Sequence, residues 1–317
     1  MLNVVKPSAD VLAVWRAQLW PVPWSRSFMP DIALMYEVFD HCHVGDLTSI
    51  AALNRFHIVV VRKYLRQRFG IMVGRFFKNP QEFGDTLAEC QAVVSGAAAL
   101  HLMLPAKTTH WRPGVLEIFV PSLRYLTLRD HLERLGYTIV SETKEDYASY
   151  TYSQIRQVIT LSNGKRKVVV VVSKVPASFA PIFQYHSTAA MNFVSAHHIF
   201  CAYPELTLRG LSMINPGPFY RGCFDITTMD EMREYNLYGF GYVETGTFGV
   251  YNSKGRTLTD SKCLWVGLKL TPYVCNSGAE LLRLYGVADA HWILGGKICG
   301  VRGTFAFPRL DLIEDES

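Results

Sequence analysis

A turn of small residues and one acidic side chain are the residues of this chain whose types and spacing could bind a nucleotide. The turn, Ser95-Gly96-Ala97, lies between a predicted strand at 92–95 and a predicted helix at 97–103, and Glu117 lies in a second predicted strand at 115–120. The N-terminus of a helix presents backbone N–H groups and the positive end of the helix dipole, which suits a phosphate group. The pattern therefore predicts a phosphate-binding turn with one carboxylate near it.

Metal-dependent phosphoryl transfer needs more than one carboxylate. Side chains two residues apart on a strand point to the same face, and two carboxylates placed in this way can hold a pair of Mg²⁺ ions. Here Glu117 takes the second of these positions and Val115 the first. The strand at 168–172, where a third carboxylate would be expected, consists of valines. We therefore interpret Glu117 as the remnant of a metal site or as a structural hydrogen-bonding residue.

The missing carboxylate could instead come from the later part of the chain. Asp225, Glu244 and Asp260 are the candidate donors, and a metal site would then join Glu117 to Asp260 or Asp225. Asp260 also lies where its side chain could cap a following helix. We favour this capping role for Asp260 over the metal site.

The strand that carries Glu117 is followed by the pattern of a helix. Pro121-Ser122 is a typical helix start. The apolar positions after it have helical spacing, so we expect the side chains of Leu123, Leu126, Leu132 and Leu135 to point inward.

A β-hairpin is predicted next, with strands at 155–161 and 165–173 on either side of Asn163-Gly164. This dipeptide favours a type I′ turn. The run of valines at 168–172 has no alternation of apolar and polar residues, which predicts a central strand buried on both faces.

Before this α/β unit the chain predicts three short helices. Pro30-Asp31 is a helix start, and Ile32 and Met35 lie on an apolar face. Asp46 is a candidate N-cap for a second helix that includes Leu47, and a third helical run spans about 56–69.

The rest of the chain has a weaker pattern. From Ala180 to Ile199 the apolar residues have helical spacing, and beyond Pro204 only a hairpin of 242–251 with 256–259 is indicated. The sequence therefore divides into a strap at 1–29, a helical segment at 30–70, an α/β core at 71–204 and a C-terminal extension at 205–317.

Several of these segments resemble the nucleotidyltransferase superfamily, whose mark is a strand, a Gly-Ser turn, a spacer and a strand with two acidic residues. Their order is similar to that in a group of fungal proteins that join an F-box-like N-terminus to this fold. The resemblance implies an α/β fold with a nucleotidyltransferase-like mixed sheet flanked by helices, after a small helical F-box-like segment. The segments that carry it are Met29-Pro30-Asp31, Asp46-Leu47, Phe76-Phe77-Lys78-Asn79-Pro80, Val94-Ser95-Gly96-Ala97-Ala98-Ala99-Leu100, Leu116-Glu117-Ile118-Phe119-Val120, Tyr185-His186-Ser187-Thr188 and Arg256-Thr257-Leu258-Thr259-Asp260.

The F-box-like segment implies a protein partner. An F-box lays apolar helices on the Skp-type adaptor subunit of a ubiquitin ligase, so Pro30, Ile32, Met35 and Leu47 are the candidate partner-binding residues. The alternative is a helical subdomain that only packs against the rest of the chain. An exposed apolar patch on these helices would distinguish the two.

The departures from the family pattern decide the function that we expect. The turn serine of the family is Ala97 here, and its first carboxylate is Val115. We therefore expect a non-catalytic interaction protein on a degenerate nucleotidyltransferase-like fold, such as a substrate adaptor of a ubiquitin ligase, with no cofactor. The alternative is a metal-dependent nucleotidyltransferase or nucleotide-binding protein that uses Glu117, Mg²⁺ and the turn Ser95-Gly96-Ala97.

Composition narrows the remaining classes. The chain of 317 residues is 49% hydrophobic and 19% charged, which is typical of a globular protein. Its net charge of +5 is mild, so nucleic acid is not the expected partner, although the basic cluster at 165–167 leaves that class open. The N-terminus lacks the features of a signal peptide, and the apolar run at 168–172 is far shorter than the ~18 residues of a membrane span. We expect an intracellular protein, cytoplasmic or nuclear, without a membrane partner.

Overall fold

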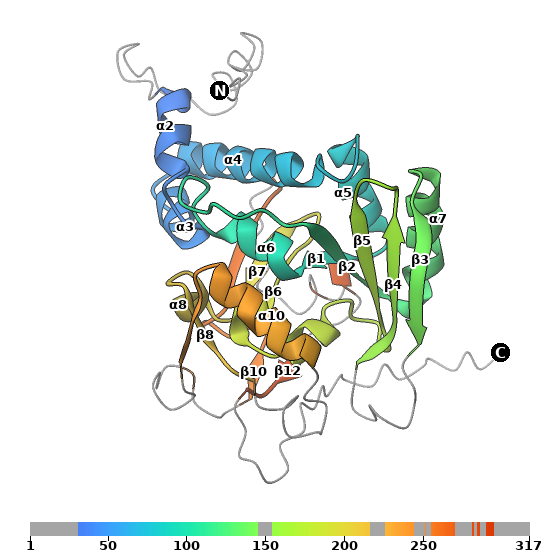
Figure 1. Ribbon diagram of the computed structural model, residues 1–317. Helices are drawn as coiled ribbons and strands as arrows, with labels where there is room; N and C mark the ends of the chain where they lie inside the picture. The colour runs from blue at the N-terminus through green and yellow to red at the C-terminus, as the bar shows by residue number, and fades with distance from the viewer. Residues whose placement is uncertain are drawn as a thin grey trace, which may run out of the picture.

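A computed structural model describes residues 31–144, 154–215, 226–243, 251, 255–269, 281, 284–285 and 290–294. These residues form eight α-helices and a mixed sheet of eight strands, which confirms the α/β class (Figure 1). The α-helices are α2 (Ile32–Phe39), α3 (Val44–Ala51), α4 (Arg55–Val73), α5 (Pro80–Glu89), α6 (Gly96–Met103), α7 (Tyr125–Arg134), α8 (Pro204–Thr207) and α10 (Ile226–Leu237). Three short 3-10 helices are η2 (Ser122–Arg124), η3 (Ala180–Gln184) and η4 (Thr188–Ala190).

The main sheet joins strands from distant parts of the chain. In spatial order its strands are β11 (Leu264–Gly267), β7 (His198–Cys201), β6 (Asn192–Val194), β1 (Val93–Ser95), β2 (Val115–Pro121), β5 (Lys167–Ser173), β4 (Ile155–Ser162) and β3 (Thr138–Lys144). Two small sheets pair β10 (Arg256–Thr257) with β12 (His291–Trp292) and β8 (Leu211–Met213) with β9 (Gly241–Val243).

One pair of neighbours in the main sheet is parallel, β2 with β5, and the other pairs are antiparallel. β5 lies between β2 and β4. This is the central position that its run of valines predicts. Val168, Val170 and Val172 are almost fully buried, and Val171 is buried on the other face. The prediction of a central strand buried on both faces is confirmed.

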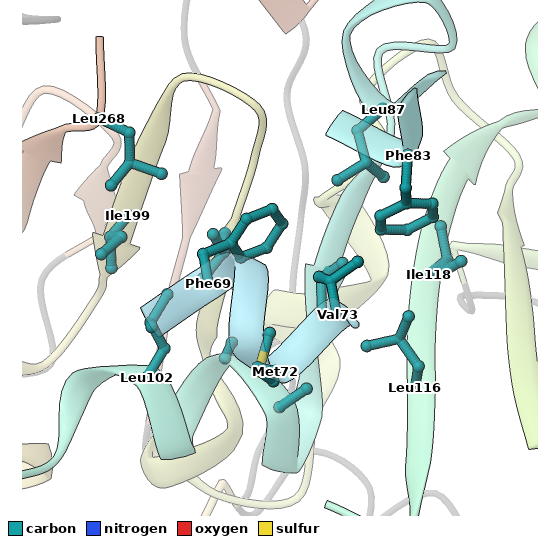
Figure 2. Packing of buried hydrophobic residues seen from close by; sticks show 14 of the residues in the cluster. Phe69, Met72, Val73, Phe83, Leu87, Leu102, Leu116, Ile118, Ile199 and Leu268 are labelled. Carbon is teal, nitrogen blue, oxygen red and sulfur yellow. The ribbon is translucent and has the colours of Figure 1, made fainter. Parts of the chain in front are cut away.

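The two faces of the sheet belong to two apolar clusters because side chains alternate along each strand. In β2, Leu116, Ile118 and Val120 point into the cluster that includes α4 and α5. Phe119 points into the opposite cluster, and Glu117 shares its face. Figure 2 shows Phe69, Met72 and Val73 of α4 among side chains from α5, α6, β2 and β7.

The N-terminal helices share their core with the sheet. α4 runs across the fold, with α2 and α3 at its N-terminal end and α5 near its other end (Figure 1). Val60, Leu65 and Val73 of α4 are buried in the same cluster as Leu116 of β2. The helical segment predicted at 30–70 is therefore packed on the sheet, and its last helix extends to Val73.

Of the two helix starts predicted at Asp31 and Asp46, one is confirmed and one is wrong. Asp31 caps α2 by accepting a hydrogen bond from the backbone N–H of Ala33 (2.9 Å), as the predicted helix start requires. Asp46 is not the N-cap of α3. His43 takes that position, and its ring and the Asp46 carboxylate form a reciprocal capping box.

Two predictions for the α/β unit were wrong in whole or in part. Of the four leucines expected to point inward, Leu132 is buried and Leu135 is partly buried, but Leu123 and Leu126 are 86% and 58% exposed. Leu123 lies in the 3-10 turn η2 before α7, and Leu126 lies off the face of α7 that Leu128 and Leu132 bury. The hairpin between β4 and β5 is present, but its turn is not type I′. Among the described residues other than glycine only Gln91 has a positive φ, so Asn163 lacks the left-handed conformation that type I′ requires.

The segment after Ala180 is not a long helix. It forms η3 and η4, followed by the hairpin of β6 and β7. Phe193 and Phe200 point to one face of these strands and Ile199 to the other. The apolar residues of the two short strands happen to have a spacing that resembles that of a helix. The predicted hairpin of 242–251 with 256–259 is also wrong where it is described, since β9 pairs with β8 and β10 pairs with β12.

In the described part of the chain, no helix is both long and apolar enough to span a bilayer. The predicted strap at 1–29 lies outside the described residues.

Candidate functional site

The turn at the start of α6 holds the Glu117 carboxylate. Ser95 at the end of β1 is the Cα partner of Glu117 in β2, and α6 begins at the next residue, Gly96. Gly96 has a φ of +63°, in the left-handed region that favours glycine. A Cβ at this position would lie 2.5–2.7 Å from the carboxyl atoms of Glu117. The turn therefore requires glycine for two reasons, its backbone conformation and the close approach of the carboxylate.

The hydroxyl of Ser95 anchors this turn to the neighbouring strand β6. The Ser95 side chain is fully buried, and its Oγ donates a hydrogen bond of 2.6 Å to the backbone carbonyl of Asn192 in β6. Ser95 is the N-cap residue of α6 but makes no capping hydrogen bond with its side chain. The predicted phosphate-binding residues Ser95, Gly96 and Ala97 are thus contiguous at a helix start, with the hydroxyl of Ser95 committed to the sheet.

Tyr185 is the hydrogen-bonding partner of Glu117. This residue follows η3, and its hydroxyl donates a 2.6 Å hydrogen bond to Oε2 of Glu117. Both side chains keep some exposed surface. In the sequence, Tyr185 belongs only to a segment of family resemblance, and no local pattern indicates that its phenol reaches the carboxylate.

Burial raises the pKa of Glu117 above its usual value of 4.5. Desolvation is the largest cause, because removing water from a carboxylate disfavours its charged form. The hydrogen bond from Tyr185 lowers the pKa, while the charges of Glu231 and Glu234 raise it. Burial, together with the Glu117 carboxylate, also raises the pKa of Tyr185 well above its usual value. The pair therefore keeps its protons to a higher pH than either group would in water.

The acidic neighbours of Glu117 come from α10, a helix that the sequence analysis did not predict. Tyr235 of this helix is buried in a small cluster with Leu100 of α6 and Phe240, and Figure 1 shows α10 beside α6. Glu231, one turn before Tyr235, lies 3.2 Å from Nδ1 of the buried His186. The charges of Glu231 and Glu234 act on Glu117. The signal for this helix is weak in the sequence because few apolar residues mark its buried face.

No neighbouring strand supplies a second carboxylate to this face. Across the sheet, the residues in register with Glu117 are Ser95 on β1 and Val169 on β5, and Val169 is in register with Thr160 on β4. Val115, two residues before Glu117, is apolar. In this row across β1, β2, β5 and β4, Glu117 is therefore the one carboxylate.

Of the predicted donors of a further carboxylate, the structure describes Asp260 alone. Asp225 and Glu244 lie outside the described residues. Asp260 does not cap a helix, because the next element of the chain is the strand β11. It pairs with Arg256, whose Nε lies 2.8 Å from Oδ2 of Asp260. Its other oxygen accepts a hydrogen bond from the backbone N–H of Lys262, which holds the pKa of Asp260 below its usual range together with Arg256. In the described part of the chain, no three His, Cys, Asp or Glu side chains are grouped so that they could hold a metal ion.

The candidate partner-binding residues lie in different environments. Pro30 is outside the described residues, and Leu47 is fully buried, so Leu47 contributes to the core and not to a surface. Ile32 and Met35 are partly buried against the main cluster. The exposed apolar residues of α2 are Leu34 and Val38, at 64% and 52%.

Comparisons with known proteins found no matching protein-family model, no matching curated protein and no matching solved structure. The resemblance to nucleotidyltransferases and F-box proteins therefore rests on the sequence segments alone. The interpretation of the site rests on its geometry.

The contact between Gly96 and Glu117 predicts that Gly96→Ala destabilises the protein by about 2 kcal/mol or more. A left-handed backbone costs a residue with a Cβ ~1–2 kcal/mol, and the clash with the carboxylate adds to it. Urea denaturation measures the change. In a Glu117→Ala background the same substitution should cost less, because only the backbone cost is left.

Gly84→Ala is the matched control for this substitution. Gly84 lies within α5, and a Cβ there would meet nothing within 4 Å. The free energy of unfolding of the Gly84→Ala variant should equal that of the wild type or exceed it by up to ~1 kcal/mol, since alanine favours a helix more than glycine does. Equal effects of the two substitutions would contradict the assigned role of Gly96.

The raised pKa of Glu117 predicts a pH-dependent effect of Glu117→Gln. The folded protein binds this proton more tightly than the unfolded chain, so the contribution to stability is complete below pH 4.5 and is lost as the pH rises through the folded pKa. Glutamine is uncharged and keeps an oxygen that accepts the hydrogen bond of Tyr185. The substitution should therefore raise the free energy of unfolding at pH 7 and change it little at pH 4.

Urea denaturation at both pH values tests this expectation. Glu37→Gln, on the exposed side of α2, is the control and should have the same small effect at each pH. Destabilisation by Glu117→Gln at pH 7 would show that the charged form is the one that the fold favours.

Proposed function

We propose that the protein is a non-catalytic interaction protein on a degenerate nucleotidyltransferase-like fold, and that it acts as a substrate adaptor of a ubiquitin ligase. The observation that carries the first part is the row Ser95, Glu117 and Val169 across three neighbouring strands, which contains one carboxylate. Two metal ions that stabilise the attacking and leaving oxygens need several shared oxygen ligands. One carboxylate does not supply them.

The environment of Glu117 supports the same proposal. A metal-ligating carboxylate must be ionised, and burial together with Glu231 and Glu234 favours the neutral form of Glu117 by raising its pKa. Its Oε2 also accepts the hydrogen bond of Tyr185. Glu117 is better suited to tie β2 to the segment after η3 than to bind a cation.

The second part of the proposal rests on the N-terminal helices. Leu34 and Val38 lie one turn apart on α2, so their side chains share a face of that helix. Both are exposed, and Leu53, just after α3, is 69% exposed. An exposed apolar patch on the F-box-like helices is the feature expected of a surface that binds a Skp-type adaptor.

Nucleotide binding without catalysis is the second candidate. It is favoured by the start of α6, where no side chain caps the helix and the turn is shaped by Gly96. The first backbone N–H groups of such a helix can accept a phosphate group. In this candidate Mg²⁺ would reach the site with the nucleotide.

The adaptor proposal predicts that the full chain co-purifies with a Skp-type adaptor and that Leu34→Asp combined with Val38→Asp abolishes the association. Each aspartate would place a charge in an apolar contact, which is costly to bury. Affinity capture followed by mass spectrometry measures the association, and circular dichroism checks the fold of the variant.

Leu123→Asp is the matched control because Leu123 is an exposed leucine at η2, in a different part of the fold. It should leave the association unchanged. Failure of the wild-type chain to capture the adaptor, or normal capture by the double variant, would refute this role of α2.

A further inference from the structure

Two basic segments lie at the same end of the sheet because β2 and β5 are parallel. Val115 at the start of β2 is the Cα partner of Lys167 at the start of β5. The residues that lead into these two strands therefore lie side by side. Arg112 precedes β2 by three residues, and Arg166 immediately precedes β5.

A third basic segment is tied to this end of the sheet by Tyr137. Its hydroxyl donates a 2.8 Å hydrogen bond to the backbone carbonyl of Phe76, next to Arg75. Tyr137 stands directly before β3, whose first residue, Thr138, pairs with Ser162 at the end of β4. That end of β4 leads into the turn that carries Arg166. Arg75 is thus held near the turn between β4 and β5.

Among the described residues, no acidic side chain neutralises the three arginines. The segments 74–80, 108–114 and 163–167 contain six lysines and arginines and no aspartate or glutamate. In the described part of the chain, no acidic side chain forms an ion pair with Arg75, Arg112 or Arg166. Burial lowers the pKa of Arg75, and the charges of Arg166 and Arg112 lower it further. The fold holds these like charges together at an energetic cost.

The loop that carries Arg112 is fixed by the residue before it. The Trp111 ring stacks on Tyr238 after α10, with centroids 4.0 Å apart, and His101 of α6 contacts Trp111 edge-on at 5.3 Å. Anchoring of this kind reduces the ordering cost of binding, because the loop that carries Arg112 is already held in place.

We propose that Arg75, Arg112 and Arg166 form a binding site for a phosphorylated side chain of a partner protein. Guanidinium groups match phosphate oxygens with paired hydrogen bonds, and a phosphate dianion would remove the repulsion among the three arginines. Recognition of phosphorylated motifs by clustered arginines is a general mode of peptide binding. As the site that selects the substrate of an adaptor, it rests on the function proposed above.

The distribution of charge favours a phosphopeptide over a nucleic acid. A nucleic-acid surface needs a basic track that follows several phosphates. α4 does not extend the cluster into such a track, because Arg62 is buried and Arg68 donates hydrogen bonds to the carbonyls of His101 and Leu104. The charges of Arg112 and Arg166 both act on Arg75, which suits one doubly charged group.

The test is fluorescence anisotropy of the full chain with a fluorescein-labelled pool of degenerate peptides that have a fixed central phosphoserine. The same pool with serine at the centre is the reference. The phosphorylated pool should bind at least ten-fold more tightly. Arg112→Ala, at an exposed residue, and Arg75→Lys, which keeps the charge and loses the fork, should each weaken its binding several-fold.

Arg66→Ala is the matched control, since Arg66 is an exposed arginine on α4 outside the cluster, and it should have no effect. Equal binding of the two pools, an equal loss in Arg66→Ala, or tighter binding of a single-stranded RNA that is lost in the same variants would overturn the proposal. Capture of the Skp-type adaptor should be unchanged in Arg112→Ala. Phosphopeptide binding without adaptor capture would reject the adaptor role alone, and adaptor capture without phosphopeptide binding would reject this site alone.

Discussion

The parallel pairing of β2 with β5 is the constraint on which both the candidate site and the arginine cluster depend. It sets Val169 opposite Glu117, so that the face of the sheet with the carboxylate has an apolar neighbour where a metal site would need a ligand. The same pairing sets Val115 opposite Lys167 and brings the loops before both strands to one end of the sheet. A change of register by one residue would turn Leu116, Ile118 and Val120 of β2 away from the apolar cluster that they share with α4, so the core fixes both arrangements.

The two regions place charge in opposite ways. Around Glu117, the fold gathers carboxylates from β2 and α10 and meets the cost by favouring the protonated form and by a hydrogen bond from Tyr185. At the end of the sheet it gathers arginines, which do not lose their protons at neutral pH. The first arrangement can be neutral without a ligand, whereas among the described residues no acidic side chain neutralises the second, which a bound anion would do. This difference is why we assign a structural role to Glu117 and a binding role to the arginines.

Local sequence signals predicted the parts of the fold that depend on neighbouring residues. The strand around Glu117, the start of α6 and the hairpin of β4 and β5 follow from apolar runs and turn residues. The signals failed where tertiary contacts decide. Phe193 and Phe200 belong to two short strands, which helical spacing imitated, and Tyr185 and α10 reach Glu117 from 68 or more residues away in sequence. No pattern within a short window contains that information.

We propose that the protein binds partners without catalysing nucleotidyl transfer. This is tested most directly by incubating the purified chain with labelled nucleoside triphosphates and Mg²⁺ or Mn²⁺, with transfer to protein, nucleic-acid and small-molecule acceptors measured in parallel. We expect no metal-dependent transfer above that of a heat-denatured sample. Transfer that depends on the metal and disappears in Glu117→Gln would contradict it.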